Sequence, residues 1–290
     1  MSDGPPFIDA AAAWELVCRV SDARRASPHE PVRISLRRSL NGSDPALVVD
    51  SDGRWRADAM VVAEAAEILD LYLPLCRRSI AIAHLAQSLD GRIATSSGDS
   101  LYVTGPHNLD HMHRMRALVD AVLVGAGTVR HDDPQMTVRR VQGPNPVRVV
   151  IDTERRLGSA FRVFQDGQAP TLLVCAEDRV GSGDGFSQRP GTEIIGVPRH
   201  EDGLNMAAVV SALAARGLHR LLVEGGGITV SRWLRQGCLH RLQITVAPVL
   251  IGSGRPSIIL PEIARLADAM RPATRRFIQG EDVMFECRLT

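Results

Sequence analysis

The sequence contains no lysine, and all 34 of its basic residues are arginine. Mechanisms that need a side-chain primary amine are therefore excluded, including Schiff-base catalysis, pyridoxal-phosphate chemistry and the GK[ST] phosphate loop. Arginine cannot replace lysine in them because its guanidinium stays protonated. The arginines face 33 acidic residues and leave a net charge of +1. Charge therefore gives no reason to expect nucleic acid or an anionic membrane as a partner.

Aromatic residues, paired cysteines and long apolar runs are also scarce. Aromatics make up 4% of the 290 residues, so the core must be built mainly from aliphatic side chains. The five cysteines are scattered without a CxxC, which predicts a reduced, cytoplasmic protein and no zinc site. No apolar stretch reaches the roughly 18 residues of a membrane span. The first 30 residues lack the pattern of a signal peptide, so none is expected.

The pattern changes near residue 78. Residues 1–78 predict a small α+β extension with no catalytic motif, with helices over 10–20 and 58–72 and strands over 32–40 and 46–49. Residues 79–290 alternate strands with helices, which predicts an α/β domain with a mainly parallel sheet flanked by helices. The expected strands are 80–86, 121–124, 147–151, 171–175, 193–197, 220–223 and 242–246. The expected helices are 107–118, 205–216 and 229–236.

Glycine-rich turns follow two of these strands, at 125–134 (GAGTVRHDDP) and 223–227 (VEGGG). In such folds ligands bind beyond the carboxyl ends of the strands. Glycine lets the backbone approach an anion, and a following helix directs free N–H groups at it. Neither turn is a full GxGxxG, and each alone could be only a tight turn. Two in one α/β domain favour a nucleotide cofactor.

Two arginines and one glutamate are candidate ligand contacts. Arg116 and Arg139 could clamp a phosphate, although a surface position is the alternative for any of the 34 arginines. Glu224 follows an apolar strand and precedes three glycines, so it should be partly buried beside a donor. It could accept N–H groups from the edge of a heterocycle, or it could cap a backbone turn.

Asp132 and a group of histidines are the remaining polar candidates. Asp132 could orient a water or a nicotinamide group, or belong to a turn before Pro134. The segment that holds His107, His111 and His113 offers an i, i+4 pair that a metal could use. It is interpreted as a solvated helix face because no third ligand is evident. No metal is therefore predicted.

Together these clusters resemble the reductase domain of the bifunctional riboflavin-biosynthesis proteins, whose fold is like that of dihydrofolate reductase. The resemblance runs from about residue 79 to residue 289, with several motifs in the family's order and spacing. They are AQSLDGRIAT (86–95), GDSLYVTG (98–105), MRALVDAVLVGAGTVRHDDPQMTVR (115–139), NPVRVVIDT (145–153), LVEGGG (222–227) and APVLIGSG (247–254).

The resemblance implies an activity and a set of contacts. Such reductases use NADPH to open the ribose ring of a phosphoribosylamino-pyrimidine, and hydride transfer to the sugar C1′ gives the ribitylamino product. The implied cofactor contacts are Ala86, Tyr102, Thr128, Asp132, Thr153, Gly226, Gly227, Ile228, Thr229 and Val230. The implied substrate contacts are Ser100, Arg116, Met136, Arg139 and Glu224. Family members are usually homodimers, so a homodimer without a metal is expected.

The chain departs from the family in two places. The family usually has a lysine four residues before the SLDG serine, where this chain has His84. Histidine titrates near neutral pH, so His84 could act with Asp132 as a catalytic group, or it could be structural. The deaminase signatures HxE and PCxxC of the bifunctional proteins are absent, so a stand-alone reductase is expected.

Two other functions fit parts of the pattern. A reductase of a dihydropterin or dihydrofolate would share the fold and cofactor but would not need a phosphate clamp. A non-catalytic nucleotide-binding sensor would have residues 1–78 as its output module. The combination of Asp132, Glu224 and both arginines favours an enzyme over this sensor.

Overall fold

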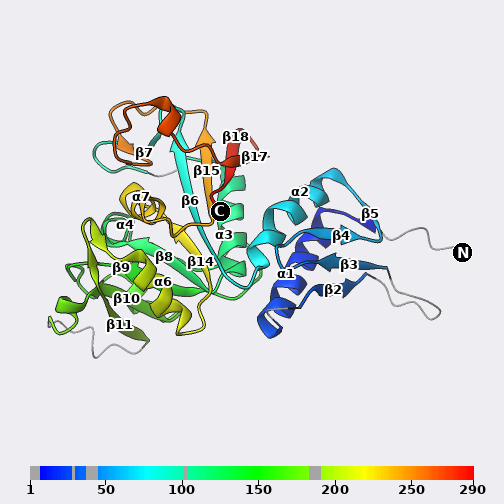
Figure 1. Cartoon of the computed structure of the whole chain (residues 1–290), viewed down its shortest axis with the longest axis horizontal. Coiled ribbons are helices and arrows are strands. Elements are labelled where there is room, and N and C mark those ends of the chain that lie inside the picture. The colour runs from blue at the N-terminus through cyan, green and yellow to red at the C-terminus, as the bar shows by residue number, and fades with distance from the viewer. Residues whose placement is uncertain (1–6, 28–29, 37–44, 101–102, 183–190) are drawn as a thin grey trace, which may run out of the picture. The chain divides into compact units, whose positions relative to one another are not determined.

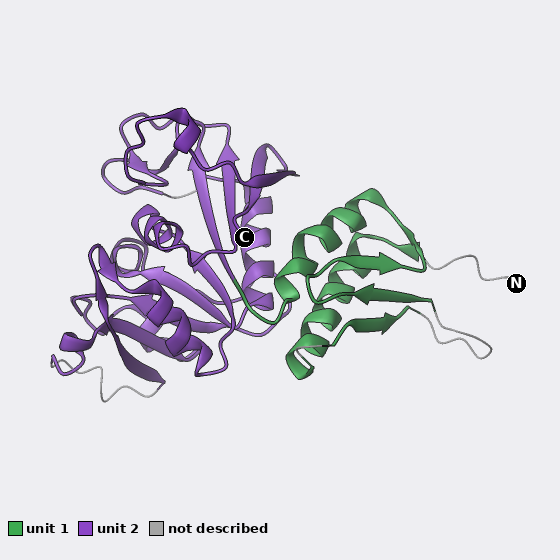
Figure 2. Ribbon diagram, viewed as in Figure 1, with its two compact units in different colours: residues 1–80 green, residues 81–290 purple. Residues whose placement is uncertain are grey.

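The computed structural model describes residues 7–27, 30–36, 45–100, 103–182 and 191–290. It divides into two compact units, residues 1–80 and residues 81–290 (Figure 2). The sequence predicted a boundary two residues earlier, after residue 78. None of the helices in the described ranges is both long and apolar enough to cross a membrane.

The first unit is a small α+β fold. It contains α1 (Ala10–Ala26), α2 (Ala63–Tyr72), the 3-10 turn η1 (Leu73–Cys76), a parallel pair of β1 (Phe7–Ile8) with β5 (Met60–Val61), and an antiparallel sheet of β2 (Val32–Ser35), β3 (Ala46–Val49) and β4 (Trp55–Ala57). Helix α1 starts where the Asp9 side chain accepts the Ala12 N–H at 2.8 Å. The second helix begins later than its pattern predicted because β5 and the residue after it occupy positions 60–62.

The second unit is built on a nine-stranded sheet (Figure 1). Its strand order is β11-β10-β9-β8-β14-β6-β15-β18-β17. The strands are β6 (Ile80–Ser88), β8 (Ala121–Gly125), β9 (Val147–Ile151), β10 (Thr171–Ala176), β11 (Thr192–Val197), β14 (Arg220–Glu224), β15 (Arg241–Ala247), β17 (Ala273–Gln279) and β18 (Asp282–Arg288). The run from β11 to β14 is parallel, as is the pair of β6 and β15, whereas β18 and β17 are antiparallel additions.

Helices cover both faces of this sheet. On one face, α6 (Met206–Ala214) and α7 (Gly227–Arg235) join the aliphatic core, where Trp233 is fully buried. Alternate residues of β6 point to opposite faces, so Leu85 joins that core while His84 points to α3 (Pro106–Leu118). The remaining elements are α4 (Ala126–Asp132), α5 (Arg162–Gln165), the 3-10 turns η2 (Glu177–Arg179) and η3 (Leu266–Asp268), and the short pairs β7 (Arg92–Ala94) with β16 (Arg255–Pro256) and β12 (Arg199–His200) with β13 (Gly203–Leu204).

The predicted fold class, an α/β domain with a mainly parallel sheet flanked by helices, is confirmed.

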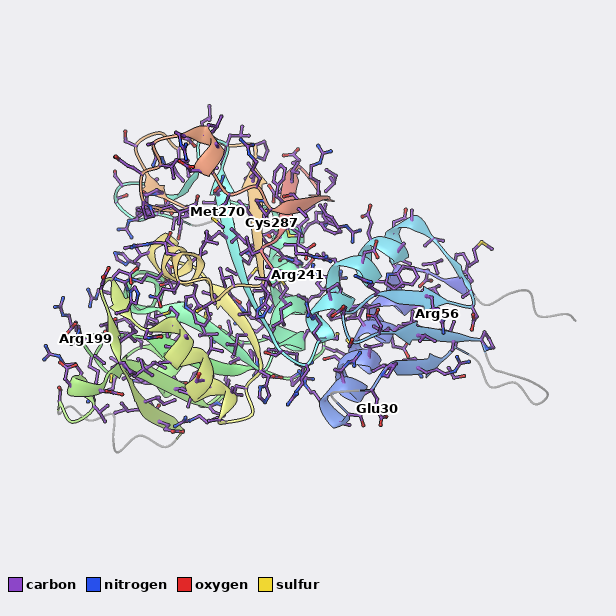
Figure 3. The ribbon with its side chains drawn as sticks, viewed as in Figure 1. Glu30, Arg56, Arg199, Arg241, Met270 and Cys287 are labelled. Carbon is purple, nitrogen blue, oxygen red and sulfur yellow. The ribbon has the colours of Figure 1, made fainter. Side chains whose placement is uncertain are left out.

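The polar side chains between α3 and the sheet were not expected. Arg241, labelled in Figure 3, forms a buried ion pair on β15 with Glu286 of the adjacent β18. This ion pair therefore adds to the apolar packing that holds β18 against β15.

Candidate active site

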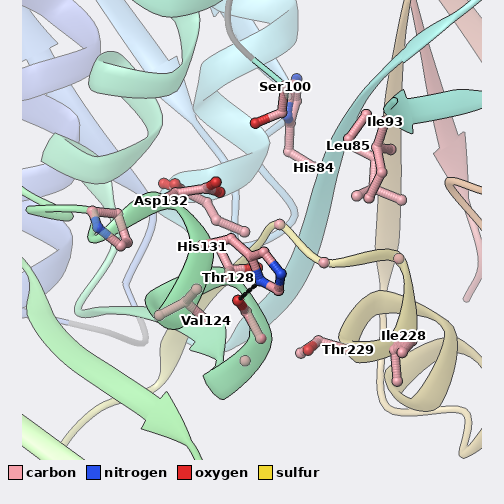
Figure 4. A pocket seen from close by; sticks show the side chains of 18 of the residues that line it. His84, Leu85, Ile93, Ser100, Val124, Thr128, His131, Asp132, Ile228 and Thr229 are labelled. Atoms are coloured by element: carbon pink, nitrogen blue, oxygen red, sulfur yellow. Dashed lines mark hydrogen bonds between the residues drawn. The ribbon is translucent and has the colours of Figure 1, made fainter. Parts of the chain in front are cut away.

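A cavity of about 1010 Å³ opens at the carboxyl ends of β6, β8, β9 and β14 (Figure 4). Its walls come from these strand ends, from α3, α4 and α7, and from the segments around β7 and β16. Parallel strands bring their carboxyl ends to one edge, which is why motifs far apart in the sequence meet here. The cavity is therefore the site that the strand-end clusters predicted.

The glycine turn before α7 forms one wall of the cavity. Gly226 has a φ of 69°, a left-handed conformation that glycine adopts at little cost, and it precedes the first residue of the helix. A Cβ on Gly227 would lie 2.5 Å from the backbone oxygens of Pro256 and Ser257. The Thr229 N–H of this turn donates to the Gly226 carbonyl at 2.9 Å, so the N–H groups that precede it, at a helix start that borders the cavity, suit a bound diphosphate.

Replacing Gly227 by alanine should therefore destabilise the protein and abolish the nucleotide binding that the sequence predicts. The new methyl group would meet the backbone of Pro256 and Ser257, so the α7 turn would have to move away from this segment. Gly158→Ala is the matched control, since nothing lies within 4 Å of its added Cβ. Thermal unfolding and NADP⁺ titration of both variants test this expectation. Equal behaviour of the two variants would contradict it.

Arg116 and Glu224 form a buried bidentate ion pair beside this turn. Arg116 Nε donates to Glu224 Oε1 at 2.7 Å, and Nη2 donates to Oε2 at 2.6 Å. Arg116 Nη1 also donates to the Thr137 carbonyl at 3.1 Å. Burial alone would lower the pKa of Arg116, but the adjacent Glu224 carboxylate raises it. The two hydrogen bonds fix the Glu224 side chain in the cavity wall.

Arg139 lies in the same wall without a carboxylate partner among the described residues. Its Nη1 donates to the Thr137 hydroxyl at 2.7 Å. Desolvation and the neighbouring Arg116 lower the pKa of Arg139, although the guanidinium remains charged. The two arginines predicted as a clamp are thus brought together, but Arg116 faces Glu224 while Arg139 keeps its charge available for an anion.

His84 also lines the cavity, held in a network under α3. Its Nε2 lies 3.0 Å from Asn108 Oδ1 and 3.2 Å from Thr245 Oγ1. Asn108 Nδ2 in turn donates to Thr104 at 2.9 Å, which orients the amide. Desolvation, then the charges of His111 and Arg116, lower the pKa of His84 to about 3. The imidazole is neutral at physiological pH, so it has no extra proton to donate.

The interpretation of residues 107–118 as a solvated helix face was wrong. His111 and His113 are 2% and 5% exposed, and His111 Nε2 lies 2.8 Å from Gln243 Oε1 on β15. His111 packs against the polar strand residue Gln243 and His113 against the Arg139 backbone, so both are buried although they look like surface residues in the sequence, whereas His107 is exposed. Among the described residues no three His, Cys, Asp or Glu side chains gather as a metal site.

Asp132 ends α4 at the mouth of the cavity, opposite the segment around β16. Desolvation raises the pKa of its carboxyl, against the charges of His131 and Arg255 and a hydrogen bond from Ser100. His131 Nδ1 lies 2.6 Å from the Gly127 carbonyl, so this nitrogen carries the proton and the ring can accept from Arg255 Nη2 at 3.2 Å. Asp132 therefore lies where a partly desolvated acid can face a ligand.

The chain after α4 has a strained backbone at the site. Asp133 and Met136 have φ values of 39° and 56°, in the left-handed region that side chains other than glycine seldom adopt. Met136 is 2% exposed and contributes to the cavity wall. The strained segment leads directly into Thr137, whose carbonyl and hydroxyl hold the two arginines.

Two acids in the strand-end motifs have structural roles. Asp90 accepts from Ser88 and from the backbone N–H groups of Ile251 and Gly252, which lower its pKa to about 2. Asp152 accepts the Leu157 N–H at 2.8 Å. Both carboxylates fix the loops that border the cavity.

Most of the predicted contacts come together. The predicted site residues that line the cavity are His84, Ala86, Ser100, Arg116, Thr128, Asp132, Met136, Arg139, Thr153, Glu224, Gly226, Gly227, Ile228 and Thr229. Val230 is an exception, because its side chain is fully buried in the core beneath α7. Tyr102 lies outside the described residues.

The sequence did not single out several other lining residues. Arg130, Arg156 and Arg232 also border the cavity, and none of them donates to a carboxylate within the described part of the chain. Asn108 and His113 approach from α3. No sequence signal distinguishes these arginines from the other members of a set of 34.

Comparison with known proteins agrees with this geometry. Residues 80–271 match the RibD C-terminal domain. The chain belongs to this family. The matched residues include both glycine turns, Glu224 and both predicted clamp arginines, so the family match covers the cavity.

Two RibD-family relatives match this chain over different shares of their own length. A 2,5-diamino-6-ribosylamino-4(3H)-pyrimidinone 5′-phosphate reductase of Methanothermobacter thermautotrophicus is 34% identical over 220 residues, which are 72% of this chain and 97% of that protein. The riboflavin biosynthesis protein RibD of Bacillus amyloliquefaciens is 32% identical over 206 residues, which are 69% of this chain and 54% of that protein. The chain thus spans nearly all of the first relative and about half of the second.

A solved structure of the same family has this fold. The deaminase/5-amino-6-(5-phosphoribosylamino)uracil reductase of Thermotoga maritima superposes with a TM-score of 0.61 at 25% identity. The superposition covers 80% of this chain and 64% of that one.

Proposed function

We propose that this chain is an NADPH-dependent reductase of a phosphoribosylamino-pyrimidine, of the 5-amino-6-(5-phosphoribosylamino)uracil type, that forms the ribitylamino product in riboflavin biosynthesis. One observation carries the proposal: a single cavity joins a glycine turn at a helix start, a fixed carboxylate at Glu224 and the guanidinium of Arg139, which has no carboxylate partner among the described residues. The names of the relatives support the same reaction class.

The cavity suits a phosphorylated nicotinamide cofactor. The α7 turn and Thr128 would hold the diphosphate, and Arg130, Arg156 and Arg232 favour a cofactor with an additional phosphate, hence NADPH. When bound, this cofactor supplies the hydride. The side chains contribute binding, orientation and exclusion of water.

The substrate groups have matching partners. Glu224 would accept N–H groups from the pyrimidine edge, and Arg139 would bind the 5′-phosphate. As the C1′–O4′ bond breaks and C1′ receives hydride, the ring oxygen needs a proton. Desolvation raises the pKa of Asp132, whereas it lowers that of His84 to about 3, so we assign this proton to Asp132 and not to His84.

The kcat of the wild type should show no ionisation attributable to His84 between pH 5.5 and 8.5. A group with a pKa of about 3 stays neutral throughout that window. The pH profile of kcat for His84→Gln should therefore have the same shape as that of the wild type, even if kcat itself is lower. A limb in the wild-type profile that disappears in this variant would show that His84 is the acid.

The decisive experiment is turnover of the pyrimidine 5′-phosphate, followed by NADPH absorbance and product mass. If the protein consumes NADPH with another acceptor but not with the pyrimidine 5′-phosphate, the proposed substrate is wrong. The main alternative is a reductase of a dihydropterin or dihydrofolate. Arg139→Ala should raise KM at least tenfold if the substrate carries a phosphate, and should change it little for an unphosphorylated pterin.

The resemblance and the surface of the second unit support a proposal about the assembly state. Exposed apolar side chains gather late in the chain, including Leu250, Leu266, Met270 and Ile278 (Met270 is labelled in Figure 3). We propose that they contribute to a homodimer. Light scattering at micromolar concentration should give twice the mass of one chain. The compartment proposed is the cytoplasm, since the five cysteines are thiols.

A further inference from the structure

The anion site at Arg139 needs a second donor. The bidentate pair and the Thr137 carbonyl use three of the five N–H groups of Arg116, one on each nitrogen, and two of the three serve Glu224. Arg140 is turned away, since its Nε donates to Asp110 at 2.5 Å. A phosphate monoester normally collects several hydrogen bonds, and one guanidinium supplies only part of them. The neighbouring residue with a suitable group is His113.

His113 is held with one ring nitrogen toward the Arg139 backbone. The Arg139 N–H donates to His113 Nδ1 at 2.9 Å. A backbone N–H can only donate, so Nδ1 must be the unprotonated nitrogen and the ring proton lies on Nε2. The side chain is 5% exposed and borders the cavity. Nε2 has no hydrogen-bond partner among the described residues. It is not one of their fully buried polar atoms, so a ligand can reach it.

We propose that His113 is a substrate-binding residue whose Nε2–H, together with the guanidinium of Arg139, binds the phosphate monoester of the substrate. This inference rests on the proposed function, since it concerns the phosphate end of the same cavity. Nothing in the sequence motifs marked His113 for this role. The residue comes from α3, whereas Arg139 follows the strained loop after α4.

The charges around His113 suit an anion. The positive charges of Arg116, Arg139 and Arg140 act on the ring, and Asp110 on the same helix is the opposing carboxylate. Desolvation and then these arginines lower the pKa of His113 to about 4, so the ring is a neutral donor before a ligand binds. A phosphate would both neutralise the surplus of positive charge and complete the hydrogen bond that Nε2–H lacks.

Two substitutions separate this role from a structural one. His113→Asn can keep an acceptor near the Nδ1 position for the Arg139 N–H, but it loses the donor. His113→Gln can place an N–H near the Nε2 position, but it loses that acceptor. The proposal expects His113→Asn to raise KM for the phosphorylated substrate roughly ten- to a hundredfold with little change in kcat. His113→Gln should recover most of this loss.

A purely structural histidine would reverse this order, with His113→Gln the worse variant, and that result would overturn the proposal. The dephosphorylated ribosylaminopyrimidine provides the control substrate, since wild type and His113→Asn should bind it equally. An equal loss with both substrates would also contradict phosphate recognition.

A measurement without turnover separates this inference from the proposed function. In ¹⁵N-histidine-labelled full-length protein, inorganic phosphate should shift the Nε2 resonance of His113, and Arg139→Ala should abolish the shift. If the pyrimidine phosphate is not reduced but the shift occurs, the proposed substrate fails and the anion site stands. If reduction occurs but phosphate leaves His113 unchanged and His113→Asn has the wild-type KM, this inference alone fails.

Discussion

Glu224→Gln is expected to lower kcat/KM for the pyrimidine phosphate by roughly a hundredfold or more. The change removes the anionic acceptor for the substrate edge and leaves the Arg116 guanidinium buried beside a neutral amide. Breaking a buried ion pair from one side typically costs about 3 to 5 kcal/mol of stability. Steady-state kinetics and urea unfolding of the same preparation measure both effects.

A matched pair on the surface gives the control for this prediction. Asp268→Asn removes the exposed ion pair with Arg265, and it should change stability by less than about 1 kcal/mol and leave kinetics unaltered. The double variant Arg116→Leu/Glu224→Leu should regain stability without regaining activity, because both charges are removed together. A Glu224→Gln enzyme with wild-type kcat/KM would show that this carboxylate does not touch the substrate.

Acid should unfold the second unit well above the usual range of carboxylate titration. His84, His111 and His113 have pKa values lowered to about 3, 4 and 4, first of all by desolvation. Below pH 6.5 the unfolded histidines bind protons that the folded ones do not, so the free energy of unfolding falls as the pH falls. Each histidine contributes a slope of about 1.4 kcal/mol per pH unit between pH 6.5 and its folded pKa.

Urea unfolding at intervals from pH 7.5 to 4.5 measures this slope. His111→Gln should reduce this slope by about 1.4 kcal/mol per pH unit, the contribution of one proton. Glutamine can still reach Gln243 but does not titrate. Gly158→Ala changes an open position without a titratable group and should leave the slope unaltered. A stability that is constant between pH 7 and 5 would mean that the three rings are not kept neutral by the fold.

Most of the site could be predicted from the sequence because its motifs follow strands. The carboxyl ends of β6, β8, β9 and β14 had to share one edge, and this placed Thr128, Thr153, Glu224 and Gly226 together. Their chemistry could be deduced from residue type. Resemblance to a family supplied the remaining contacts and the identity of the reaction.

Pairing between side chains could not be predicted in the same way. The partner of Glu224 lies 108 residues away in the chain, and composition offers 34 equivalent candidates. The three histidines are kept neutral by desolvation and nearby arginines, which a sequence does not display. The buried face of α3 was misread because Gln243 and Thr245 form the strand surface beneath it, so both sides of the contact are polar.

The strand order has a consequence for how the protein is made. β6 lies between β14 and β15, yet β14 starts only at Arg220 and β15 ends at Ala247. At usual rates of synthesis, roughly ten to thirty seconds separate the emergence of β6 from that of its last partner. During this interval β6 and β8 expose unpaired edges that other chains could join. Nascent-chain aggregation, and demand for chaperones, should therefore peak before residue 247 leaves the ribosome and decline after it.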